Sequence, residues 1–161
     1  MKEYEGMKNP FSNLTIRFSK FGLLIVAAQA LPNVIWALCP PVPNRLEGIA
    51  SSSLFIEYGE HILRVVIVIF LLFLGNKTKE NKLFGGNFAV ISYIAIALYW
   101  CCWILYFAGI QPNFIIYAMV ALPTAAFICA GIAEKVWPIY TVGTLFLLFH
   151  LSVTAENFPI R

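Results

Sequence analysis

Residues 88–107 read FAVISYIAIALYWCCWILYF, an apolar and aromatic run without a single charged side chain. A helix needs about 20 such residues to cross the hydrocarbon core of a bilayer. A second run, FIIYAMVALPTAAFICAGI, follows at residues 114–132 after the turn Gln111-Pro112-Asn113. Because the linker between the runs is so short, they are expected to form two antiparallel neighbouring helices.

The whole chain has the composition of a protein that is surrounded by lipid. Of its 161 residues, 60% are hydrophobic and only 12% are charged, whereas soluble domains are about 45–50% apolar and about 25% charged. A core of this size cannot hide so many apolar side chains from water. The composition therefore predicts an integral membrane protein with the lipid bilayer as its main partner. It excludes a disordered chain, an ordinary soluble enzyme and a nucleic-acid binder.

Three further apolar runs extend the first pair to an all-α bundle of five transmembrane helices. The predicted spans are residues 21–39, 54–74, 88–107, 114–132 and 136–153. They form one membrane domain over residues 21–153, preceded by a cytoplasmic or interfacial segment at residues 1–20 and followed by an external tail at residues 154–161. The fifth run is near the short limit for a membrane span.

Lysine and arginine are shared unevenly between the two sides of this bundle. One side would hold Lys2, Lys8, Arg17, Lys20, Lys77, Lys79, Lys82 and Lys135, and the other only Arg45 and Arg161. Cytoplasmic loops carry an excess of these residues, so the N-terminus is predicted to be cytoplasmic and the C-terminus external, in the cell membrane. An alternative stays open, because Ala28-Gln29-Ala30 fits a signal-peptide cleavage site, and cleavage there would leave four spans.

The second span carries a stripe of ionisable side chains, Glu57, Glu60, His61 and Arg64. At 100° per residue they fall within an arc of about 100° on one helix face. Arg64 lies about 15 Å along the helix from Leu54, near the bilayer midplane, where charged residues normally face a bundle interior or a wet cavity. The stripe therefore predicts a ligand pocket. Two alternatives remain: internal i, i+4 pairs between Glu60 and Arg64 and between Glu57 and His61, or a membrane boundary near Glu60.

Polar and aromatic side chains from the other spans are expected at the same depth, in the outer half of the bundle. Gln29 and Asn33 share a face of the first span beside Pro32, which leaves the carbonyl of Ala28 in need of another partner. Trp and Tyr also gather at membrane interfaces without a further role. The predicted ligand-binding residues are Glu57, Glu60, His61, Arg64, Gln29, Asn33, Tyr99, Trp103 and His150.

No motif in the chain names a reaction. The sequence has two histidines, no aspartate and no H-E-x-x-H, so no metal and no cofactor are predicted. The cysteine spacing matches no zinc or redox pattern. Small residues of the fourth span, among them Ala118, Ala125 and Gly131, favour close helix packing inside the bundle, with homo-oligomerisation through this face as the alternative.

One segment of the first span and its exit loop resembles small multispanning bacterial membrane proteins that carry no functional name. It reads Leu31-Pro32-Asn33-Val34-Ile35-Trp36 and is followed by Pro40-Pro41. The resemblance covers the first span and its exit loop, and it implies no activity. In size and helix number the chain is also similar to the translocator-protein (tryptophan-rich sensory) family. It lacks the W-x-P pattern of that family, so no residue roles are carried across.

The leading expectation for function is non-enzymatic. The protein is predicted to bind, sense or help to move a small amphipathic molecule or lipid headgroup in an outward-facing polar pocket. Arg64 would meet an anionic group, and Glu57 or Glu60 would balance its charge. The alternatives are a membrane enzyme that acts on a lipid or isoprenoid with a Glu/His acid–base pair, and an accessory subunit of a larger membrane complex.

Overall fold

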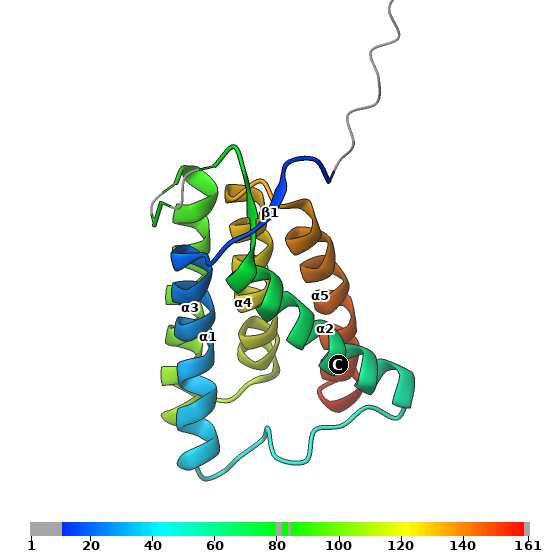
Figure 1. The fold of residues 1–161 in the computed structure, drawn as a ribbon. Coiled ribbons are helices and arrows are strands. Elements are labelled where there is room, and N and C mark those ends of the chain that lie inside the picture. The colour runs from blue at the N-terminus through cyan, green and yellow to red at the C-terminus, as the bar shows by residue number, and fades with distance from the viewer. Residues whose placement is uncertain (1–10, 80–81, 84, 160–161) are drawn as a thin grey trace, which may run out of the picture.

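The computed structural model describes residues 11–79, 82–83 and 85–159. These residues form an all-helical bundle with one short antiparallel ribbon (Figure 1). The helices are α1 (Lys20–Leu38), α2 (Leu54–Phe73), α3 (Asn87–Phe107), α4 (Asn113–Ala133) and α5 (Trp137–Asn157), and the strands are β1 (Leu14–Ile16) and β2 (Leu74–Asn76).

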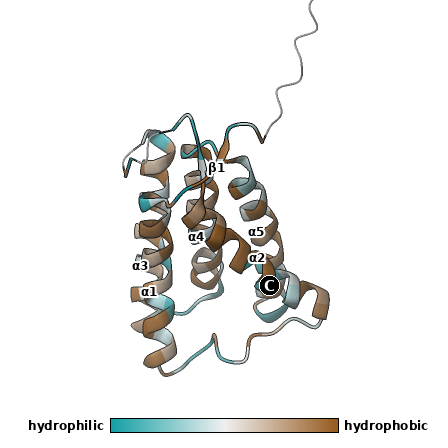
Figure 2. Cartoon of the chain, in the orientation of Figure 1, coloured by the Kyte–Doolittle hydropathy of each residue, from teal (hydrophilic) through white to brown (hydrophobic). Residues whose placement is uncertain are grey.

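Each predicted span corresponds to one helix, and four of the helices are long and apolar enough to cross a membrane. These four are α1, α3, α4 and α5. The remaining helix, α2, has a similar length but carries Glu57, Glu60 and Arg64. Figure 2 shows the hydrophobic colour along most of the helical ribbons and hydrophilic colour in the segments near β1. Length and composition thus support four of the five predicted spans.

The fifth helix is longer than predicted, because it continues beyond residue 153 to Asn157. Its last turns contain polar side chains that bond to the helix itself. The Thr154 hydroxyl donates to the carbonyl of His150, and the Asn157 amide donates to the carbonyl of Val153. The helix carbonyls satisfy these polar side chains, which therefore fit within the last turns without ending the helix.

The core of the bundle is built around α4, the most buried of the four apolar helices. Ala126 and Ala130 are fully buried there. A Cβ added at Gly131 would lie 2.8 Å from Cβ of Ile139 on α5, so only a glycine allows this approach. The small residues of the fourth span therefore have a packing role within the single chain.

Helices α1 and α2 form a V that is closed at one end. Near the closed end, the carbonyl of Leu71 on α2 lies so close to Gly22 on α1 that an added Cβ would overlap it. From there α2 runs obliquely towards α5 (Figure 1), where Gly59 lies against the ring of Phe149. The two helices therefore diverge along the bundle, and this divergence leaves room between them.

The closed end of the V, termed here the ribbon end (residues 11–19, 74–79 and 134–136), is held by polar contacts. Arg17 Nη2 lies 3.1 Å from Glu134 Oε2, and the Asn76 amide donates to the carbonyl of Lys135 at 2.8 Å. Burial raises the pKa of the Glu134 carboxyl, and the charge of Arg17 offsets part of that rise. These contacts join three segments that are far apart in the sequence.

The other end, termed the loop end (residues 39–53, 108–112 and 158–159), is closed by the long segment between α1 and α2. The hydroxyl of Tyr106 and the indole N–H of Trp36 both donate to Asn44 Oδ1, each at 2.9 Å. The Glu156 carboxylate accepts the backbone N–H of Ser52 at 2.8 Å. Successive connections therefore alternate between the two ends of the bundle.

Candidate functional site

A cavity of about 710 Å³ lies between the diverging helices. All five helices line it, together with the segment between α1 and α2. Its walls are mainly apolar, with a small number of polar groups. All nine residues predicted from the sequence to bind a ligand line this one cavity: Gln29, Asn33, Glu57, Glu60, His61, Arg64, Tyr99, Trp103 and His150.

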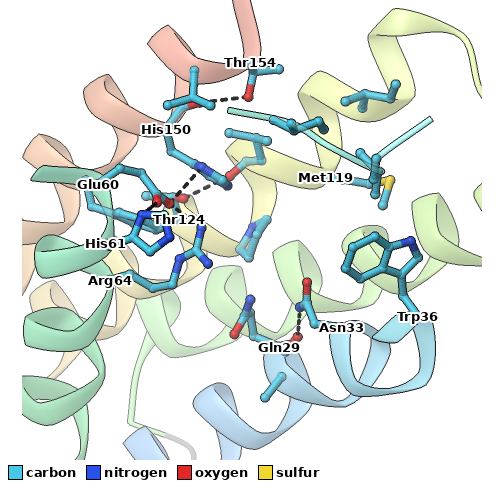
Figure 3. A pocket seen from close by; sticks show the side chains of 18 of the residues that line it. Gln29, Asn33, Trp36, Glu60, His61, Arg64, Met119, Thr124, His150 and Thr154 are labelled. Atoms are coloured by element: carbon cyan, nitrogen blue, oxygen red, sulfur yellow. Dashed lines mark hydrogen bonds and ion pairs between the residues drawn. The ribbon is translucent and has the colours of Figure 1, made fainter. Parts of the chain in front are cut away.

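Glu60 is the centre of the polar wall (Figure 3). Its side chain is only 4% exposed and pairs with Arg64 Nη2. Its Oε1 lies 3.1 Å from His150 Nδ1 on α5, and its Oε2 lies 3.2 Å from His61 Nδ1. A buried carboxylate is tolerated where a cationic donor pairs with it, as Arg64 does here, and the contact with His150 brings α2 against α5.

Glu57 and His61 do not pair through their side chains, unlike one of the alternatives drawn from the sequence. Nδ1 of His61 lies 2.8 Å from the backbone carbonyl of Glu57. A carbonyl only accepts, so this nitrogen carries the proton, and Nε2 of a neutral His61 offers a lone pair. Within the part of the chain that the structure describes, the Glu57 carboxylate has no ion pair or hydrogen bond.

The cavity is open along one side of α2. The side chains of Arg64 and His61 both line it, yet they remain 52% and 64% exposed. The exposed side chain of Val34 lines it from α1. The opening therefore lies between the two arms of the V, and a molecule can reach the cavity through it.

The opposite wall is formed by α1 and α3. The Asn33 amide donates to the Tyr99 hydroxyl at 2.7 Å and to the carbonyl of Gln29 at 2.9 Å. Tyr99 packs edge-to-face on Trp103, with 6.2 Å between the ring centroids. Figure 3 shows Asn33 and Trp36 across the cavity from the Glu60 cluster. Aromatic groups thus face ionisable groups over the enclosed space.

The carbonyl that Pro32 releases has found a partner outside its own helix. The indole N–H of Trp100 on α3 donates to the carbonyl of Ala28 at 2.8 Å. Trp100 therefore satisfies a backbone group that the proline leaves without an intrahelical donor. The bond also fixes α1 against α3 beside the cavity.

The sequence prediction missed the contribution of α4, because the pocket was expected between the other four helices. Six α4 residues line the cavity: Ile116, Met119, Val120, Pro123, Thr124 and Phe127. An apolar helix has no polar stripe to mark the face that it turns inward. The one available signal was Pro123-Thr124, a helix-disturbing pair in the middle of the span. In contrast, Tyr117 lies outside the cavity lining, and its hydroxyl donates to the carbonyl of Phe158 at 3.1 Å.

The arrangement offers acid–base groups and hydrogen-bonding groups at the cavity wall. Over residues 11–79, 82–83 and 85–159, no group of three or more His, Cys or Glu side chains is arranged to hold a metal ion. The cysteines Cys39, Cys101, Cys102 and Cys129 are all free thiols. Comparison of the chain with known proteins gives no match to a family model, to a curated protein or to a solved structure.

Proposed function

We propose that this chain is an integral membrane protein whose five helices all cross the bilayer, with the ribbon end cytoplasmic and the loop end external. Four helices have the required length and composition. The charges of α2 are compatible with a fifth span, because Glu60 is buried and Arg64 lines the cavity. The ribbon end also carries basic residues such as Lys77 and Lys79, which favours the cytoplasmic side.

We propose further that the cavity binds a small amphipathic molecule or a lipid headgroup, in order to sense it or to help move it. The observation that carries this proposal is the Glu60 cluster on the wall of a mainly apolar cavity. Ligand sites commonly combine an apolar lining with a few polar groups that fix orientation. Ionisable groups at membrane depth also mark sites of substrate or ion passage.

The exposure of the cluster supports a binding site over a purely structural ion pair. A pair that only locks two helices together would be enclosed on all sides. Here Glu60 is enclosed, but its partners Arg64 and His61 are about half exposed at the cavity. Their free nitrogen atoms remain available to a ligand that enters between α1 and α2.

A second candidate function is acid–base catalysis on a lipid or isoprenoid. It is favoured by the 3.2 Å contact between His61 Nδ1 and the Glu60 carboxylate. The imidazole ring of His61 lines the cavity, so a bound molecule could contact it. The carbonyl of Glu57 orients the ring through Nδ1, and the nearby Glu60 charge would stabilise the ring when Nε2 takes up a proton as a general base. Turnover of lipids from a membrane extract by the purified protein would favour this candidate over binding alone.

Native mass spectrometry of purified protein tests the binding proposal. The variant Ala30→Phe places a large ring in the cavity, since Ala30 lines it. Ala27→Phe on the same helix is the matched control, because Ala27 is exposed and lies outside the lining. We expect a lipid or small-molecule adduct on the wild type and on Ala27→Phe, and its loss from Ala30→Phe. Equal adducts on both variants would contradict a ligand in this cavity.

A further inference from the structure

The cavity contains one acidic group whose charge no neighbouring group balances. Its lining holds two carboxylates, Glu57 and Glu60, and one guanidinium, Arg64. Arg64 pairs with Glu60, whose two oxygen atoms also contact His61 and His150. With neutral imidazoles, the lining therefore has one net negative charge, and that charge is on Glu57.

We infer that the ligand of this cavity is an amphipathic organic cation, such as an alkylammonium, with Glu57 as its counter-ion. The inference rests on the proposed binding function and names the charge of the ligand. The sequence predicted that Arg64 would meet an anionic group of the ligand, and a cationic ligand replaces that expectation. That guanidinium already has an anionic partner within the protein, so an anionic ligand would compete with Glu60 for it.

The hydrogen-bonding groups beside Glu57 also suit a cation that carries N–H donors. His61 donates from Nδ1 to the carbonyl of Glu57, so Nε2 of the neutral ring is an acceptor. His61 follows Glu57 by one helical turn, and both line the cavity. A carboxylate and an imidazole lone pair on one side of α2 form an acceptor pair for an ammonium group.

The lining of the cavity also includes aromatic side chains that are held in a fixed orientation. Trp36 near the end of α1 and Glu57 near the start of α2 both line the cavity close to the loop end. The Trp36 indole N–H is bonded to Asn44, and Trp103 packs edge-to-face on Tyr106, with centroids 5.6 Å apart. Aromatic faces attract organic cations, and this attraction increases when water is excluded.

The remainder of the cavity accepts an apolar tail. Farther from the loop end its lining includes Val68, Phe127 and Phe146, with no further charged residue. The opening between α1 and α2 lies along the membrane-facing side of the bundle in the proposed topology. An amphipathic cation can therefore enter from the lipid with its head at Glu57 and its tail along α4.

Calorimetric titration with three probes of equal chain length tests the charge. Hexylammonium, hexyl sulfate and hexyl glucoside are added to the protein in maltoside micelles at pH 8, where a primary alkylammonium keeps its charge. We expect the wild type to bind the cation at least about tenfold more tightly than the sulfate or the glucoside, because only the cation pairs with a partly buried carboxylate. Glu57→Gln should remove this preference, and Glu57→Asp should restore part of it.

The matched control is Glu47→Gln, because Glu47 is an exposed glutamate of the loop end outside the cavity lining. This variant should keep the wild-type preference. Tighter binding of hexyl sulfate than of the cation, lost in Arg64→Gln, would contradict a cationic ligand. That result would leave the proposed binding function unchanged. Equal binding of the three probes, unchanged in Glu57→Gln, would also contradict a cationic ligand. If none of the probes binds, both the charge inference and the binding proposal fail.

Discussion

Glu57 and Glu60 are neighbours on one helix face, yet they have different surroundings. Glu60 is buried against α5 and is surrounded by Arg64, His61 and His150. The Glu57 side chain is partly exposed and lines the cavity near the loop end. Because α2 runs obliquely towards α5, one turn of helix separates a carboxylate fixed by the protein from one that is open to a ligand.

The pair formed by Glu60 and Arg64 should respond asymmetrically to substitution. Arg64→Leu leaves a buried carboxylate with two histidine partners, which should lower the free energy of unfolding by about 1–3 kcal/mol. Glu60→Leu leaves a half-exposed guanidinium that stays hydrated. This variant should therefore lower the free energy of unfolding by less than about 1 kcal/mol. The double variant should resemble Glu60→Leu. Thermal unfolding in maltoside micelles measures all three, and simple additivity of the single effects would refute the coupling.

Trp100 has a role that depends on Pro32. Trp100→Phe keeps most of the ring but leaves the carbonyl of Ala28 without its donor, which should cost about 1–3 kcal/mol of stability. In a Pro32→Ala background, the restored backbone N–H at position 32 can donate to Ala28, so Trp100→Phe should then cost less.

Trp137→Phe is the matched control for this prediction. The indole nitrogen of Trp137 is buried and has no hydrogen-bond partner in the described part of the chain. The substitution removes the same atoms without removing a hydrogen bond. Equal losses of thermal stability in Trp100→Phe and Trp137→Phe would mean that the bond to Ala28 contributes nothing measurable.

At the scale of elements, the crossing of α1 and α2 determines the shape of the cavity. The helices touch where Gly22 meets the carbonyl of Leu71, and the ribbon of β1 and β2 holds this contact next to the start of α1. The side chain of Ser19 accepts the N–H of Gly22 and so begins α1 at this point. The width of the opening therefore depends on a contact at the other end of the V.

Gly22→Ala should force α1 and α2 apart, because the obstacle is a backbone carbonyl that cannot rotate away. We expect a loss of stability of about 1–3 kcal/mol, the range found for overpacked sites, together with weaker binding of any cavity ligand. Gly85→Ala is the control, since nothing lies within 4 Å of an added Cβ there. Thermal unfolding measures the midpoint temperature of both variants. Equal midpoints would argue against a tight crossing of α1 and α2 at Gly22.

At the scale of the whole molecule, the two ends of the bundle differ in chemistry. The ribbon end collects Arg17, Lys77, Lys79 and Lys135, while the loop end is closed by tyrosine, asparagine and serine contacts. Arg45 is an exception, and it stacks over the ring of Phe158 at 5.1 Å. This difference supports the proposed orientation, in which the ribbon end is cytoplasmic.

The proposed topology predicts that residue 79 is cytoplasmic and residue 112 external. Lys79→Cys and Pro112→Cys are introduced singly into a chain whose native cysteines have been replaced. In intact cells, a membrane-impermeant maleimide should label only the cysteine at 112, and both should react after the cells are opened. Labelling at 79 but not at 112 would invert the orientation, and labelling of both in intact cells would exclude five crossings.

The amino-acid sequence by itself determined the helices and their faces. Long apolar runs interrupted by prolines, glycines and charges predicted all five helices, because these are local properties of the chain. Helical periodicity placed Glu57, Glu60, His61 and Arg64 on one face for the same reason. Most lysines and arginines lie in the connecting segments of one side of the bundle. The sequence therefore also predicted that successive connections alternate between its two ends.

Only the tertiary structure decided which partners these residues have. The oblique path of α2 pairs Glu60 with His150 from α5, whereas the Glu57 carboxylate has no partner among the residues that the structure describes, although the sequence treats the two glutamates alike. The α4 wall was not predicted, because residues such as Met119 and Phe127 belong to a helix that is apolar on every side. Pairing across helices depends on tilt and separation, and these follow from contacts such as Gly22 with Leu71 that no local pattern encodes.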